Sequence, residues 1–100
     1  MTVEKKKNDD VLLVMITGSV DANTSAGLRD EIVDELDDVA CLTFDMTDMD
    51  YISSAGLCVI LEAYQILEEK DGKVILENVR EELMYIFELT GFSDYMEFRN

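Results

Sequence analysis

Short apolar segments alternate along this chain with polar turns and with segments of helical periodicity. Residues 11–17 are apolar and rich in β-branched side chains, which is typical of a buried strand. The preceding Asn8-Asp9-Asp10 favours a turn, so a short strand over residues 3–6 is expected to pair with this strand as a hairpin. The same criteria predict strands over residues 39–45, 73–77 and 95–98.

Three segments have helical periodicity, over residues 25–36, 54–67 and 82–89. The first is amphipathic, with Asn23 or Thr24 as its expected cap, and the second is apolar on nearly all sides, which predicts burial on more than one side. Residues of the third that are expected to face inward are Leu83, Ile86, Phe87 and Leu89. The order β-β-α-β-α-β-α-β predicts a single α/β domain over residues 1–100, with helices packed against a mixed sheet.

Two adjacent serines, Ser53 and Ser54, stand where the long apolar helix should begin. Serine is favoured there because its hydroxyl accepts a hydrogen bond from an unpaired amide of the first turn. The same amides and the helix dipole also favour a phosphate group. The pair therefore predicts a helix cap, a phosphorylation site, or both.

An acidic stretch precedes these serines. Asp45 ends a predicted strand, and Asp48 and Asp50 follow in a predicted loop. Sites in open α/β sheets lie beyond the carboxyl ends of the strands, which makes Asp45 a candidate site residue. The spacing does not fit an EF-hand loop, and we expect no metal site.

The charge balance excludes some classes of partner. With 23 acidic and 8 basic residues, the formal net charge is −15, which would repel the phosphate backbone of a nucleic acid. A basic protein surface is a more suitable partner. One hundred residues with 48% hydrophobic content suffice for one core.

The absence of histidine limits the possible chemistry. A chain without His cannot assemble a Ser-His-Asp or Cys-His arrangement or an imidazole zinc site. The serines also lack the Gly-x-Ser-x-Gly elbow of hydrolases. We therefore expect a protein that is not an enzyme and that carries no cofactor.

No segment approaches the roughly 20 apolar residues that span a bilayer, and no secretory signal is apparent. We expect a cytoplasmic protein with no membrane contact. Cys41 and Cys58 lie within apolar segments, which predicts buried, reduced thiols.

Several segments together resemble the STAS domain of anti-sigma-factor antagonists. Residues 51–57, Tyr-Ile-Ser-Ser-Ala-Gly-Leu, resemble the family motif Asp-Ser-Ser/Thr-Gly-Leu-Gly at the start of a helix. Residues 17–21 resemble its Gly-x-Leu/Ile-Asp segment, residues 43–47 its Leu-Asp-Leu-Ser strand end, and residues 89–92 its late Thr/Ser-Gly-Leu turn. The resemblance covers nearly the whole chain.

The resemblance implies a phosphorylation switch. In this family, a serine kinase that is also an anti-sigma factor phosphorylates the antagonist; the dephosphorylated antagonist binds that kinase and frees a sigma factor, and a serine phosphatase resets the switch. By position, Ser54 corresponds to the phosphoacceptor, with Ser53 as the alternative. We also expect the chain to be a monomer when free. The partner-binding residues that the resemblance implies are Asp21, Asn23, Thr24, Asp45, Thr47, Ser53, Ala55 and Gly56.

The chain departs from the family pattern at three positions near the acceptor. Ser53 replaces an Asp, Ala55 replaces a Ser or Thr, and Cys58 replaces a Gly. We also expect the terminal helix of many family members to be absent, which would leave apolar surface exposed or used in a contact.

Other functions fit parts of the sequence. A STAS-like module that binds a protein or a ligand without a phosphoswitch shares every motif, and in it Ser54 would only cap the helix. A receiver domain phosphorylated at Asp45 is disfavoured, because no acidic pair follows the first strands. An acidic carrier protein is disfavoured because such proteins are helical.

Overall fold

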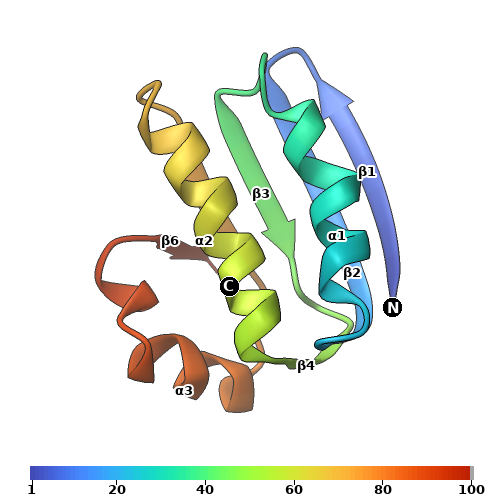
Figure 1. The fold of residues 1–100 in the computed structure, drawn as a ribbon. Coiled ribbons are helices and arrows are strands. Elements are labelled where there is room, and N and C mark those ends of the chain that lie inside the picture. The colour runs from blue at the N-terminus through green and yellow to red at the C-terminus, as the bar shows by residue number, and fades with distance from the viewer. Residues whose placement is uncertain (100) are drawn as a thin grey trace.

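The computed structural model describes residues 1–99, which form a mixed sheet with helices against one face (Figure 1). The strands are β1 (Thr2–Asn8), β2 (Val11–Val20), β3 (Cys41–Asp45), β4 (Met49–Ile52), β5 (Lys73–Glu77) and β6 (Glu97–Arg99). The helices are α1 (Ser25–Ile32), α2 (Ser54–Glu68) and α3 (Glu81–Leu89), with short 3₁₀ turns η1 (Val33–Glu35) and η2 (Phe92–Asp94). The predicted α/β class and mixed sheet are confirmed.

The strand order is β1-β2-β3-β5-β6, and β4 pairs separately with the end of β2. β1 and β2 form an antiparallel hairpin, and Asp9 in its turn has a positive φ of 56°. The pairs β2–β3, β3–β5 and β5–β6 are parallel, so each needs a crossover, which α1, α2 and α3 provide.

The core lies between the sheet and α1 and α2. Alternate residues of β2 and β3 face these helices, and Ala63 of α2 is fully buried. The largest side chains of this layer are Leu12, Ile16, Leu42 and Phe44. α3 covers the same face near β6, where the rings of Phe87 and Phe98 meet edge to face with centroids 5.5 Å apart.

β4 is the element that the pattern did not predict, since Asp48 and Asp50 were expected to lie in a loop. Met49 and Ile52 are 0% and 2% exposed, with exposed Asp50 and Tyr51 between them. Four residues with this pattern resemble a loop because neither helical nor strand periodicity can be recognised over so short a span.

Other boundaries also differ from expectation. β3 begins at Cys41 rather than at residue 39, and the helix expected over residues 25–36 ends at Ile32 and continues as η1. Leu36 and Val39 still fill the core from the connection to β3. Hydrophobicity identified these core residues but not the backbone geometry that places them.

Three burial predictions are wrong. Leu89 is 68% exposed because it lies on the outer side of the last turn of α3. Cys58 is exposed one helical turn from Ser54, and Cys41 is half-buried on the sheet face that the helices leave uncovered. Each side chain lies in an apolar segment but points away from the core.

Ion pairs join the layers at the surface. Lys5 of β1 contacts Glu31 and Glu35, and the Arg29 guanidinium binds the Glu62 carboxylate through two hydrogen bonds of 2.8 and 2.7 Å, linking α1 to α2. Exposed pairs of this kind stabilise a fold by less than about 1 kcal/mol each.

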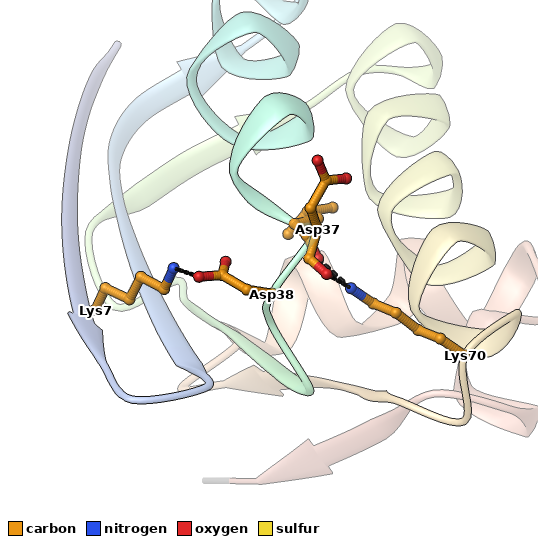
Figure 2. A network of polar contacts seen from close by, with 5 residues as sticks. Lys7, Asp37, Asp38 and Lys70 are labelled. Atoms are coloured by element: carbon orange, nitrogen blue, oxygen red, sulfur yellow. Dashed lines mark hydrogen bonds and ion pairs between the residues drawn. The ribbon is translucent and has the colours of Figure 1, made fainter.

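A second polar network lies after η1 (Figure 2). Lys7 binds the Asp38 carboxylate, and the Lys70 ammonium donates hydrogen bonds to the backbone carbonyls of Leu36 and Asp37. The Leu36 carbonyl also accepts a hydrogen bond from the Val39 amide, so the ammonium adds a second bond there and a favourable cation beyond the helical turn. The network therefore ties the end of α2 and strand β1 to the connection before β3.

No helix among residues 1–99 is both long and apolar enough to cross a membrane.

Gly56→Ala is expected to destabilise the fold, although alanine favours a helix. A Cβ at this position would lie 2.7 Å from Ile52 Cγ1 and 2.8 Å from Val20 Cγ1, both on buried β-branched side chains. Overpacking costs about 1–3 kcal/mol and helix propensity returns about 1 kcal/mol, so we expect a net loss on the order of 1 kcal/mol in the free energy of unfolding, measured with urea.

Gly27→Ala in α1 is the matched control, because nothing lies within 4 Å of its Cβ position. It should stabilise the fold by about 0.5–1 kcal/mol. Equal stabilisation by the two substitutions would show that close packing does not require Gly56.

Candidate functional site

Strand β4 brings the start of α2 beside the loop that follows β2. The Gly18 amide donates to the Asp48 carbonyl at 2.9 Å, the register then shifts, and Val20 pairs with Ile52. The Ser53 amide donates to the Val20 carbonyl at 2.8 Å. As a result, the loop that begins at Asp21 and the first residues of α2 form one surface.

The two serines differ in their roles. Ser53 is the N-cap, with extended backbone angles, and its Oγ accepts a hydrogen bond of 3.3 Å from the Gly56 amide. Ser54 is the first helical residue and is exposed, and among residues 1–99 no hydrogen bond to its hydroxyl is present. The cap prediction thus applies to Ser53, whereas the hydroxyl of Ser54 is available to a reacting partner.

The loop after β2 is held by the side chains of Asp21 and Thr24. Asp21 Oδ1 accepts hydrogen bonds from the Asn23 amide at 2.9 Å and the Thr24 amide at 3.1 Å. The Asn23 hydrogen bond is the main cause of a lowered pKa for Asp21. Thr24 stands at the N-cap position of α1 but makes no cap bond, and its hydroxyl instead donates to the Ser19 carbonyl. These bonds fix the shape of the loop next to Ser53.

Asp45 and Thr47 belong to a second polar group at the same edge of the sheet. Asp45 Oδ1 accepts from the Thr47 hydroxyl at 2.6 Å, the Thr47 amide at 3.0 Å and Asn78 Nδ2 at 3.3 Å. The hydroxyl of Thr47 is the main cause that lowers the pKa of Asp45, although partial burial acts in the opposite direction. Arg80 donates to the Thr47 carbonyl and binds Asp50, both at 3.3 Å.

The structure therefore places most of the predicted site residues in two separate groups. It brings Asp21 and Thr24 beside Ser53, and it joins Asp45 to Thr47 in a separate group. Other predicted residues differ in exposure: Asn23 is exposed, Ala55 is half-buried and Gly56 is buried beneath the surface.

Sequence reasoning missed Asn78 and Arg80, which complete the second group. Both follow the carboxyl end of β5, a neighbour of β3, and this position was the available signal. Arg80 is also the cation that balances part of the negative charge at this edge, through its pair with Asp50.

Among residues 1–99 there is no cluster of His, Cys, Asp and Glu that could hold a metal ion. Every buried side-chain nitrogen or oxygen in this part of the chain has a hydrogen-bond partner.

The fold and this edge define a class: an α/β protein whose half-covered sheet presents a serine at the start of a central helix. The model of the STAS domain family matches residues 2–100, and the chain belongs to this family.

Two kinds of relative support this assignment. The chain is 29% identical over 97 residues to the anti-sigma-B factor antagonist of Bacillus subtilis. This alignment covers 97% of this chain and 89% of that protein. The anti-sigma factor antagonist SpoIIAA in its unphosphorylated form has the same fold, with a TM-score of 0.80, 15% identity, and coverage of 99% of this chain and 87% of that one. The Bacillus cell fate determinant SpoIIAA in its phosphorylated form has a TM-score of 0.80 and 17% sequence identity, and the match covers 99% of this chain and 92% of that chain.

Asp45→Asn should destabilise the fold near pH 7 and have little effect in acid. Hydrogen bonds hold the pKa of Asp45 below its ordinary value of 3.8, so the ionised carboxylate stabilises the native state above that pH. This contribution is lost as the pH falls through the lower folded-state pKa. Urea denaturation at several pH values should therefore show the two proteins converging below about pH 4.

Asp48→Asn is the control, because the Asp48 side chain makes no hydrogen bond or ion pair with residues 1–99. The difference in the free energy of unfolding between wild type and Asp48→Asn should not show the pH dependence expected for Asp45→Asn. A constant difference between wild type and Asp45→Asn across this range would contradict an ionised, hydrogen-bonded Asp45.

Proposed function

We propose that this chain is an anti-sigma-factor antagonist whose binding to an anti-sigma-factor serine kinase is controlled by phosphorylation of Ser54. The unmodified chain binds the kinase and frees a sigma factor, phosphorylation by that kinase ends the binding, and a serine phosphatase reverses the modification. Membership of the STAS family and the names of the relatives support the role, and one relative is known in both a phosphorylated and an unphosphorylated form.

The observation that carries the proposal is the difference between the two serines. A kinase needs a hydroxyl that it can reach and that makes no essential internal bond. Ser54 is exposed at the first position of α2, while Ser53 is half-buried and caps the helix. Ser54 is therefore the acceptor and Ser53 holds the helix start in place.

The surface around Ser54 is suited to a basic protein partner. Its partner-facing residues in this proposal are Asp21, Asn23, Thr24, Asp45, Thr47, Ser53 and Ala55, with Gly56 supporting them from beneath. Ordered backbone at Asp21 and Thr24 lowers the entropy that the loop loses on binding.

Phosphate at Ser54 would change this surface with little change in the fold. It adds about −1.5 to −2 charge at pH 7. The first turn of α2 contains no acidic residue, so its free amides and dipole accommodate the charge locally. The bulk of the phosphate group at the first position of α2 then blocks close approach of the kinase.

Replacing each serine separately should distinguish the residue that stabilises the helix from the residue that is phosphorylated. Ser53→Ala loses the bond from the Gly56 amide and should cost about 1 kcal/mol in the free energy of unfolding, because a helix cap is removed. Ser54→Ala should keep wild-type stability but lose the phosphate. Mass spectrometry of the two variants purified from the native host, with and without phosphatase treatment, measures the modification, and urea denaturation measures stability.

Phosphate retained on Ser54→Ala and lost from Ser53→Ala would make Ser53 the acceptor. A wild-type chain that no co-purified kinase modifies with ATP would instead favour a STAS module without a phosphoswitch.

Ser54→Asp should weaken binding to the co-purified kinase while leaving the fold intact, because its larger carboxylate side chain reproduces part of the phosphate's bulk and charge at the contact position. Calorimetric titration of the kinase compares it with Ser54→Ala, which should bind like the wild type. Wild-type affinity in both variants would remove the support for a switch at Ser54.

A further inference from the structure

An exposed aromatic ring stands on the strand that leads into the two serines. Tyr51 of β4 is 50% exposed, and it is one of six large apolar side chains among residues 1–99 that are at least 40% exposed. The other five are Met1, Val11, Tyr85, Leu89 and Tyr95. Within residues 1–99, the Tyr51 ring pairs with no other aromatic ring and its hydroxyl makes no hydrogen bond. Strand propensity alone does not require a ring of this size, because smaller β-branched residues serve a strand equally well.

The backbone that carries Tyr51 is held on both sides. Met49 and Ile52 are buried, Ile52 pairs with Val20, and the Ser53 amide donates to the Val20 carbonyl at 2.8 Å. Neighbouring side chains of a strand point to opposite sides, so Tyr51 points away from the core that Ile52 enters. A tyrosine on a fixed strand has only two side-chain torsions to order, and it therefore loses little conformational entropy on binding.

Tyr51 lies close enough to Ser54 for one partner to cover both. A chain extends by at most about 3.6 Å per residue, so the Cα atoms of these two residues are no more than about 11 Å apart. A standard interface buries about 800 Å² on each partner, which corresponds to a patch roughly 30 Å wide. The register partner of Tyr51 is Ser19, two residues before Asp21, so the ring also borders the Asp21 loop. A partner that meets this edge of the sheet therefore meets the ring.

We propose that Tyr51 is the apolar anchor of kinase binding, and that its ring enters an apolar pocket bordered by basic side chains on the anti-sigma-factor kinase. This inference rests on the proposed function and names the residue that supplies affinity. Charged groups at an interface chiefly set association rate and specificity, whereas a buried tyrosine is among the commonest residues that dominate binding energy. The basic border follows from Asp48, an exposed carboxylate near the ring that is unpaired within residues 1–99.

An anchor at this position explains how a local modification costs much affinity. The ring reaches its pocket only if the kinase approaches the start of α2 closely. A phosphate on Ser54 prevents that approach and thereby also withdraws the ring from the pocket. The losses caused by changes at Tyr51 and at Ser54 should therefore not be additive, because both remove the same contact.

Tyr51→Thr removes the ring but keeps a β-branched residue in β4. Surface plasmon resonance against the co-purified kinase, without ATP so that Ser54 stays unmodified, should show affinity weakened by at least about tenfold. Most of the change should be faster dissociation, because loss of a buried contact changes the dissociation rate more than the association rate. Tyr51→Phe keeps the ring and should bind nearly like the wild type.

Tyr85→Ala is the matched control, since Tyr85 is 63% exposed on α3 and outside the proposed surface. It should bind the kinase like the wild type. Urea denaturation of Tyr51→Thr should give wild-type stability, which separates a lost contact from a damaged fold. In the double variant Tyr51→Thr/Ser54→Asp, the change at position 54 should weaken binding by a smaller factor than it does in the wild-type background.

Ser54→Asp, measured beside these variants, distinguishes failure of this inference from failure of the proposed function. Tyr51→Thr that binds as tightly as the wild type, while Ser54→Asp binds weakly, would overturn the anchor and leave the switch in place. Equal weakening by Tyr85→Ala would also overturn the anchor, because loss of any exposed ring would then have the same effect. A wild-type chain that no kinase binds would overturn both proposals.

Discussion

The pairing of β4 with the end of β2 is the interaction on which the site depends. One backbone hydrogen bond, from the Ser53 amide to the Val20 carbonyl, fixes where α2 begins relative to the loop after β2. Gly56 then packs so closely on Ile52 and Val20 that any side chain would separate the helix from both strands. A shift of this strand pair would therefore displace the two serines and the Asp21 loop together, although neither is part of the large hydrophobic core.

Polar bonds at the two ends of the sheet serve different purposes. After η1, Lys7 and Lys70 hold connections with cations and backbone carbonyls, contacts that only stabilise the fold. At the carboxyl edge, carboxylates accept hydrogen bonds from neighbouring amides and hydroxyls, as at Asp21 and Asp45. This keeps the carboxylates ionised while they remain partly accessible, so the edge combines a fixed shape with negative charge.

The sequence was sufficient to predict the α/β class, every helix and the strands of the main sheet, because these have clear periodicity and contain the large apolar residues. It did not predict β4, whose buried residues are only Met49 and Ile52, or the outward orientation of Cys58 and Leu89. The Asn78 and Arg80 contacts were missed because they depend on which strands are neighbours, and β3 and β5 are far apart in the chain. Local patterns identify elements, while the polar edge arises from their tertiary arrangement.

Two adjacent serines at the start of a helix can take two roles that are incompatible in a single serine, the helix cap and the phosphate acceptor. An N-cap hydroxyl must accept a hydrogen bond from the first turn, and a phosphate on that hydroxyl would disturb the bond, at a cost of about 1 kcal/mol. A free hydroxyl one residue later lies beside the same amides and dipole but bears no structural bond. In the proposed switch, with Ser53 as cap and Ser54 as acceptor, the charge of the surface changes while the helix keeps its start, which is the physical requirement for a switch that acts without refolding.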